Sequence, residues 1–215
     1  IVKHQSEKPA WAEAFVRYAD NFAKQVGGYP LFIRTDLSAM KWGGFRTCII
    51  PGSEQAIENI CNLIFKEYSR QPGELESSCL IVRELLTPQS VFVKGQEYKP
   101  FKMENGMYLG VECRIFVENG ECVCVHDYWK KESFSILNPE MASRLDIFRK
   151  QIRRDRPLLI DYACRISSLL PGCWSLDFMY TKEKGWVFID AALAACSAHA
   201  AHCPYINYWR AHTIN

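Results

Sequence analysis

The chain has 215 residues, of which 48% are hydrophobic and 13% aromatic, a composition typical of well-packed globular proteins and unlike that of disordered ones. Its formal net charge of +2 gives no electrostatic reason to expect general nucleic-acid binding. No apolar run approaches the roughly 18 residues of a membrane-spanning helix, so the sequence predicts neither a membrane span nor a membrane partner. The chain opens with Ile1 rather than Met, which leaves a processed or trimmed product open.

The N-terminal part predicts an alternation of helices and short strands. Apolar residues recur at helical spacing in 9–26 and again in 53–69. Segments 31–34, 48–50 and 79–86 are rich in β-branched and aromatic residues and are typical of strands.

The C-terminal part predicts more strands and one long helical region. We expect strands at 91–94, 110–117 and 122–126, the last two joined by a hairpin turn with the sequence Glu-Asn-Gly-Glu. Residues 139–168 have a helical pattern. A proline in the segment 153–157 predicts that this helix is broken in two.

A second hairpin, at 174–180 and 186–191, carries one carboxylate on each strand, Asp177 and Asp190. Two like charges about 4 Å apart repel by roughly 4 kcal/mol at an effective dielectric constant near 20. A divalent metal ion would reverse this repulsion. In the structural alternative, each aspartate caps a strand end or pairs with an arginine.

The ten cysteines are scattered singly through apolar segments, without a CxxC pair. Free cysteine is among the most buried residue types, so we interpret them as reduced core residues of a cytoplasmic protein. Cys122 and Cys124 are two residues apart, which on a regular strand places both on one face.

Basic residues recur inside or beside the predicted strands, where a charge is rarely buried without a partner: Arg34, Lys41, Arg83 and Arg114. These cations either form structural salt bridges or line a cleft that pairs them with phosphate oxygens. The chain contains neither a GxxxxGK[ST] loop nor a GxGxxG loop, so a nucleotide site would need another architecture.

Short motifs follow one another in a fixed order: Arg34-Thr-Asp-x-Ser, Lys41, Val82-Arg83-Glu84, Glu112-x-Arg114-x-Phe116, His126-x-Tyr128-Trp129, Trp174-Ser-Leu-Asp177-Phe and Ile189-Asp190-x-Ala192. This ordered set resembles the ATP-grasp superfamily. It is most similar to a clade of small phage and bacterial ATP-grasp proteins related to the cell-division-cycle protein 123 family. The resemblance covers roughly residues 30–205.

The resemblance implies an α+β, ATP-grasp-like fold with two α+β lobes and an antiparallel sheet in the larger, C-terminal lobe. We expect the smaller lobe within residues 1–86 and the larger lobe in residues 87–215. Such proteins bind ATP and Mg²⁺ between the lobes and activate a carboxylate as an acyl phosphate, which an amine or similar nucleophile attacks. The resemblance therefore implies a ligase whose substrate is an unidentified acid and amine, or a protein.

The resemblance also implies roles for residues of the first lobe. Lys41 and Arg34 would contact the phosphates, and Lys41 would also take part in catalysis. Arg83 and Glu84 would form the hinge beside the adenine.

In the second lobe, the resemblance implies that Glu112 and Arg114 face the ribose, the phosphates or the acceptor, with Arg114 catalytic. Asp177 and Asp190 would hold Mg²⁺, since hard carboxylate oxygens suit a hard cation. Relatives follow the last aspartate with a further ligand, and Ala195 stands where we expect that acid. This departure keeps open an alternative, a catalytically impaired nucleotide-binding or assembly protein.

The C-terminal tail carries four zinc-capable side chains: Cys196, His199, His202 and Cys203. A helix would place three of them on one side because their spacings are three and four. Structural zinc is therefore one interpretation of this segment, and plain alanine-rich packing is the other.

Overall fold

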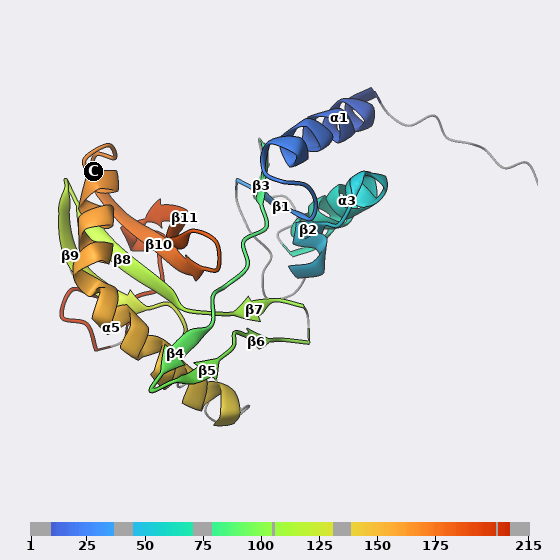
Figure 1. The fold of residues 1–215 in the computed structure, drawn as a ribbon. Coiled ribbons are helices and arrows are strands. Elements are labelled where there is room, and N and C mark those ends of the chain that lie inside the picture. Colours follow the sequence, from blue (N-terminus) through green and yellow to red (C-terminus); the bar gives the residue numbers. More distant parts are fainter. Residues whose placement is uncertain are drawn as a thin grey trace, which may run out of the picture. The chain divides into compact units, whose positions relative to one another are not determined.

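The computed structural model describes residues 10–36, 45–70, 79–104, 106–130, 139–200 and 202–206. The chain divides into a first unit, Ile1–Leu86 with Met103–Met107, and a second unit, Thr87–Lys102 with Tyr108–Asn215 (Figure 1). Both units combine helices with antiparallel strands, which confirms the predicted α+β class.

The first unit contains a three-stranded antiparallel sheet with the strand order β2-β1-β3. Its elements in chain order are α1 (Ala10–Gln25), β1 (Leu31–Thr35), the 3-10 helix η1 (Phe45–Cys48), β2 (Ile49–Ile50), α3 (Ser53–Arg70) and β3 (Leu80–Glu84). Apolar residues from the helices and the sheet form a single core, among them Ala19, Leu31, Ile50, Ile60 and Leu63. Both predicted helices and all three predicted strands are confirmed, with ends that differ by at most two residues.

The second unit is built on a four-stranded antiparallel sheet with the order β11-β10-β8-β9. The strands are β8 (Glu112–Glu118), β9 (Glu121–Asp127), β10 (Cys173–Thr181) and β11 (Gly185–Leu193). The remaining elements are two small hairpins, β4 (Val91–Val93) with β5 (Gln96–Tyr98) and β6 (Phe101–Lys102) with β7 (Tyr108–Leu109), then helix α5 (Pro139–Ser167) and the 3-10 helix η2 (Ala194–Cys196).

Helix α5 packs against β8 and β9 and runs without interruption through Pro157. The predicted break at this proline is therefore wrong. Proline costs about 3 kcal/mol in a helix interior, so other contacts must offset it. Phe148 and Leu159 on either side of it are buried, and the Trp186 indole donates a hydrogen bond of 2.9 Å to Asp155, which ties the helix to β11.

A bulge in β9 separates Cys122 from Cys124. Cys124 pairs with Phe116 of β8, and Cys122 pairs with the next residue of β8, so Val123 is an extra residue. Neighbouring residues of β8 point to opposite faces, and the two cysteines therefore do so as well. The prediction that they share a face is wrong because the bulge breaks the two-residue repeat.

The cysteine side chains are less buried than predicted. All ten are free thiols in the structure, yet only three are buried: Cys48, Cys113 and Cys124. Cys61, Cys79 and Cys196 are exposed, so the core interpretation is wrong for these three.

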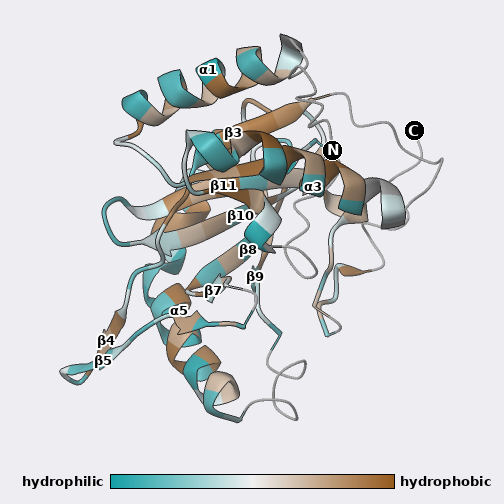
Figure 2. Cartoon of the chain, turned by 90° about the vertical axis from the view of Figure 1, so that its right-hand side faces the viewer, coloured by the Kyte–Doolittle hydropathy of each residue, from teal (hydrophilic) through white to brown (hydrophobic). Residues whose placement is uncertain are grey.

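Hydrophobic residues are frequent on the strands of both units, whereas the turn between β4 and β5 is hydrophilic (Figure 2). Among the described helices, none is long and apolar enough to cross a membrane.

Candidate functional site

Four polar side chains form one row across the four-stranded sheet of the second unit, one from each strand: His126, Arg114, Asp177 and Asp190. In the strand register, Arg114 is opposite His126 on one side and opposite Asp177 on the other. Asp177 in turn is opposite Asp190. Residues directly opposite each other in a sheet point to the same face, so this polar row lies on one surface of the sheet.

Arg114 and Asp177 form the central contact of the polar row. The guanidinium donates two hydrogen bonds to the carboxylate, from Nε to Oδ1 at 2.7 Å and from Nη2 to Oδ2 at 2.8 Å. The side chains are only 16% and 5% exposed. The structural alternative for the aspartates, pairing with an arginine, is thus confirmed for Asp177, and its role as a metal ligand stays a prediction.

Two further contacts fix the arginine. Its Nη1 donates to the backbone oxygen of Ala198 at 3.3 Å, and its guanidinium carbon lies 4.9 Å from the ring centroid of Tyr128. Burial lowers the pKa of Arg114, but the hydrogen bonds to Asp177 and the nearby charges of Asp177 and Asp190 outweigh burial and raise the pKa above its ordinary value. Arg114 is therefore a fixed cation within the polar row.

Asp190 stands at the other end of the carboxylate pair and is half-buried. Its Oδ1 accepts a hydrogen bond of 3.1 Å from the backbone N–H of Ala191. Asp177 pairs with Asp190 while Phe178 pairs with Phe188, so Ile189 is an extra residue that forms a bulge beside Asp190. Bulges commonly re-aim side chains next to functional sites.

The carboxylate oxygens of Asp177 and Asp190 are the type of ligand that Mg²⁺ prefers. Side chains directly opposite each other on antiparallel strands have Cβ atoms about 4.5–5.5 Å apart, close enough for two carboxylates to share a cation. An ionised carboxylate has about four lone-pair sites, and Arg114 takes two of those on Asp177. Asp177 therefore keeps acceptor capacity toward Asp190.

Ala192 lies on the surface of the polar row, and the role expected at Ala195, that of a further metal ligand, stays a prediction. Strand β11 ends at Leu193, and Ala195 belongs to η2 beyond it. Ala192 is two residues after Asp190 and opposite Ser175, which places it on the surface of the polar row. Its methyl group offers a metal ion no ligand.

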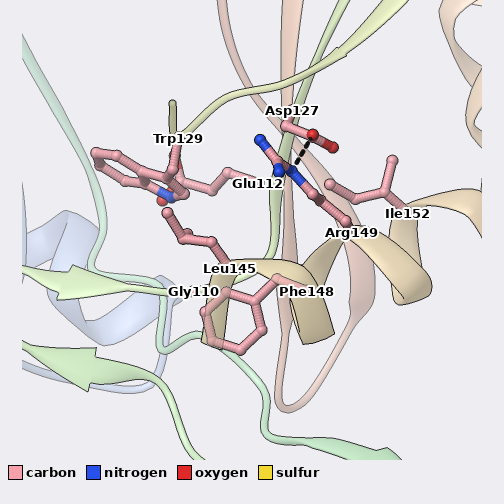
Figure 3. A pocket seen from close by; sticks show the side chains of 8 residues that line it. All are labelled: Gly110, Glu112, Asp127, Trp129, Leu145, Phe148, Arg149 and Ile152. Carbon is pink, nitrogen blue, oxygen red and sulfur yellow. Dashed lines mark hydrogen bonds and ion pairs between the residues drawn. The ribbon is translucent and has the colours of Figure 1, made fainter. Parts of the chain in front are cut away.

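Glu112 lies among side chains of α5. It is 4% exposed and lines a cavity of about 10 Å³ together with Trp129, Phe148 and Arg149 (Figure 3). The cavity has room for about one water molecule and none for a ribose. In the same cavity, Arg149 Nε donates to Asp127 Oδ2 at 2.6 Å.

Three of the four nucleotide contacts predicted in the first unit lie on its three-stranded sheet: Arg34, Arg83 and Glu84. Arg83 is opposite Phe32 and stacks over its ring, 4.5 Å from the centroid, and Arg34 is two residues after Phe32. The two arginines therefore share a face of the sheet, whereas Glu84 points to the other face. Lys41 lies outside the described residues, and the cofactor contacts of all four stay predictions.

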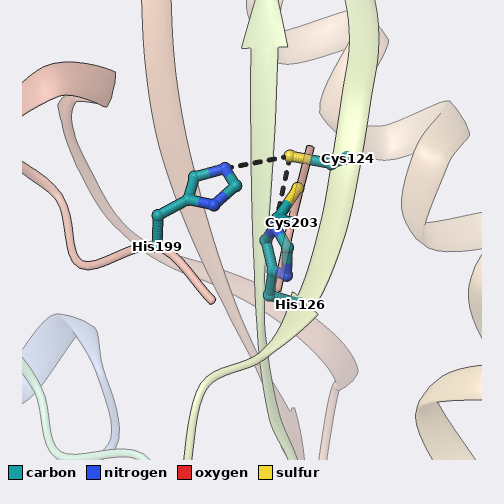
Figure 4. A group of neighbouring side chains, drawn as sticks. All are labelled: Cys124, His126, His199 and Cys203. Atoms are coloured by element: carbon teal, nitrogen blue, oxygen red, sulfur yellow. Dashed lines mark hydrogen bonds between the residues drawn. The ribbon is translucent and has the colours of Figure 1, made fainter. Parts of the chain in front are cut away.

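Two cysteines and two histidines lie close together at the His126 end of the polar row, and we call them the Cys/His cluster: Cys124, His126, His199 and Cys203. Their ligand atoms all lie within 4.8 Å of one another (Figure 4). Burial, and then the charges of His199 and Arg114, lower the pKa of His126 to about 4, so its imidazole is neutral at pH 7.

This cluster differs from the one predicted in the tail. The helix expected there is absent from the described residues 197–200, and Cys196 is exposed at the end of η2. Among the described residues, the tail supplies His199 and Cys203, and β9 supplies the other two ligands. The sequence signal was the Cys-x-His spacing on a strand, which puts both side chains on one face.

No family model and no curated protein matches the chain. Two solved structures are similar to it. The fold resembles Cdc123. The C-terminally truncated Cdc123 of Schizosaccharomyces pombe is 11% identical with a TM-score of 0.48, and the match covers 88% of this chain and 71% of that one. A second structure, Cdc123 from the same organism, gives 11% identity, a TM-score of 0.44, and 88% and 70% coverage. At this identity the likeness concerns the course of the chain, and membership of the ATP-grasp superfamily stays a prediction.

Proposed function

We propose that the protein binds ATP together with Mg²⁺ and uses it to join a carboxylate to an amine. The observation that carries the proposal is the polar row: two aspartates directly opposite each other, with a fixed arginine beside them on the same surface. Phosphates and magnesium require this combination of one cationic group and hard oxygen ligands.

Within this proposal, Asp190 and Asp177 hold the metal ion, and Arg114 orients one of its two carboxylate ligands. When bound, magnesium neutralises charge on the phosphates and so favours transfer of the terminal phosphoryl group to the acid. Nη1 of Arg114 is the guanidinium nitrogen that does not bond to Asp177, and of its two N–H groups one donates to the Ala198 carbonyl over a long 3.3 Å, so Nη1 is the nitrogen proposed to contact a phosphate oxygen.

The remaining nucleotide contacts in this proposal are those that the ordered sequence motifs predict. Arg34 and Lys41 of the first unit contact phosphates, with Lys41 assisting catalysis, and Arg83 with Glu84 bounds the adenine. The substrates to be joined are an unidentified acid and amine, or a protein. Glu112 is the weakest member of this set, because the cavity it lines has room for about one water molecule.

A second function, nucleotide binding without ligation, is favoured by two observations. Arg114 occupies both oxygens of Asp177, and Ala192 supplies no third ligand on the same surface. A loosely held magnesium ion would bind nucleotide without positioning it for transfer, as suits an assembly protein.

Thermal unfolding with and without ligand tests whether the site exists. Ligand present at 100 times Kd stabilises a protein by about 2.7 kcal/mol, a shift of several degrees at this size. We expect this shift with ATP and Mg²⁺, a smaller one with ATP and EDTA, and none for Asp190→Asn. Asp161→Asn, at an exposed position of α5, is the matched control. Absence of any shift at millimolar ATP would exclude both functions.

Release of ADP separates the two functions. The purified protein would be incubated with MgATP and pools of acids and amines, with Asp190→Asn as the blank. If the protein is a ligase, it should release ADP only when an acid is present, and the Asp190→Asn variant should release none. A protein that binds MgATP but releases no ADP above the blank is of the second kind.

A further inference from the structure

The Cys/His cluster has the composition and spacing of a structural zinc site. We propose that it binds one zinc ion, which fastens the C-terminal tail to the sheet. The proposal rests on the placement of four side chains and is independent of nucleotide binding.

The distances between the four ligand atoms are close to those found around a bound zinc ion. The Sγ atom of Cys124 lies 3.2 Å from Nε2 of His126 and 3.3 Å from Nε2 of His199. Zinc bonds of about 2.0–2.3 Å in a tetrahedron put ligand atoms about 3.3–3.8 Å apart. The widest separation in the cluster, within 4.8 Å, exceeds this by about 1 Å, which a small side-chain rotation at one ligand removes.

The local structure aims the ligands at one point. Cys124 and His126 point to the same face of β9, since they are two residues apart and pair with alternate residues of β8, Phe116 and Arg114. Phe116 then packs against both imidazoles, with ring centroids 4.3 Å from His199 and 5.6 Å from His126. Figure 4 shows the histidines approaching Cys124 from β9 and from the tail.

The donor set selects the metal. Two thiolates and two imidazoles in a tetrahedral arrangement suit Zn²⁺, whereas Mg²⁺ and Ca²⁺ require oxygen ligands. Two thiolates also neutralise the ion. Cys124 is buried and the other ligands are half-buried, so all four coordination positions are filled by protein, as in structural zinc sites rather than catalytic ones.

The zinc ion would hold a segment that has no strand pairing of its own. Residues 197–200 have no regular secondary structure, and they include Ala198, whose carbonyl accepts from Arg114. With His199 and Cys203 fixed to β9, the tail is tied to the sheet beside the polar row. Zinc would therefore support the position of Arg114 through the tail, whose Ala198 carbonyl accepts a hydrogen bond from it.

Metal analysis of the full chain tests the proposal. The protein would be produced in zinc-supplemented medium, purified without chelators and measured by elemental mass spectrometry, with an expected content of about one zinc per chain. After removal of the metal, titration with Co²⁺ should give the intense visible absorption of a tetrahedral thiolate site. Mg²⁺ should not displace the cobalt.

Variants assign the ligands. Cys203→Ser and His199→Gln should each weaken zinc binding by about 100-fold or more, since even outer-sphere changes cost 10–100-fold. The controls are the neighbouring Cys196→Ser and His202→Gln, which change exposed side chains outside the cluster and should keep full zinc content. Circular dichroism identifies any variant that fails to fold. If one of the two ligand variants does not fold, the other still tests the site.

Three results would overturn the proposal. One is a zinc content below about 0.1 per chain together with no cobalt spectrum. Another is equal loss of zinc in the control variants. The third is a disulfide between Cys124 and Cys203, detected by thiol counting and intact mass, in protein prepared under reducing conditions.

Discussion

Arg114 and Asp177 join β8 to β10 by two parallel hydrogen bonds of 2.7 and 2.8 Å, although the residues are 63 positions apart in the chain. Both side chains are largely buried. The pair holds a positive charge beside the two aspartates, which counters the repulsion between Asp177 and Asp190. It thereby links the stability of the sheet to the candidate magnesium site.

Removing the arginine alone should destabilise the protein strongly. Arg114→Met leaves the Asp177 carboxylate buried without its cation, and breaking a buried pair in this way costs about 3–5 kcal/mol. The double variant Arg114→Met, Asp177→Leu should recover most of this loss, because no charge is then left unpaired. Urea denaturation of the two single variants and the double variant measures the coupling. Additive losses would mean that the ion pair does not operate as a unit.

Magnesium affinity should respond to the residue at position 192. Ala192→Asp places a carboxylate two residues after Asp190 on the surface of the polar row, so we expect Mg²⁺ to bind about 10-fold more tightly, a gain of about 1.4 kcal/mol. The matched control is Ala195→Glu in η2, which should leave the affinity unchanged. Titration calorimetry with Mg²⁺ in the presence of ATP compares the two. A gain only in Ala195→Glu would support the sequence prediction that a further ligand belongs at position 195.

The hairpin of Asp177 and Asp190 could be predicted because it is local. Alternating side chains and a polar turn with glycine define both strands, and their pairing follows from the short connection. The partner of Asp177 could not be predicted in the same way. Several arginines lie on predicted strands, and only the strand order β11-β10-β8-β9 selects Arg114.

The Cys/His cluster could be predicted only in part, because His199 and Cys203 stand in the predicted zinc segment of the tail whereas Cys124 and His126 lie on β9. The bulge at Val123 could not be predicted either, since it reverses the side to which Cys122 points and a bulge leaves no periodic signal in the sequence. The tail joins the cluster through His199 and Cys203 from a segment with no regular spacing. Only the backbone course brings β9 and the tail together.

Helix α5 should become more stable when its internal proline is replaced. Pro157→Ala restores a backbone hydrogen-bond donor, and we expect a gain of about 1–2 kcal/mol, less than the full proline penalty because alanine also makes the unfolded chain more flexible. The adjacent Leu158→Ala, at a side chain 44% exposed, is the control and should change stability little. The free energy of unfolding in urea provides the comparison. A destabilised Pro157→Ala would show that the helix requires a local distortion at this residue.

Asp155 should make the stability of the second unit sensitive to acid. Burial raises the pKa of Asp155, but hydrogen bonds from Trp186, Arg154 and Gln151 outweigh burial, and the pKa lies below its ordinary value. A carboxyl group with a lowered folded-state pKa stabilises the fold above its unfolded-state pKa of about 3.9, and this contribution is lost as the pH falls through the folded-state value. The stabilising effect is therefore fully present at pH 7.

Asp155→Asn should remove this contribution. At pH 7 we expect a loss of about 1–3 kcal/mol, since the hydrogen bonds to a charged acceptor are weakened, and the difference from the unmodified protein should shrink below about pH 4. Asp161→Asn, whose ion pair with Arg165 is long at 3.9 Å and exposed, should have little effect at either pH. Urea unfolding at pH 7 and near pH 3 checks both statements. A loss of the same size at both pH values would mean that Asp155 acts through packing and not through its charge.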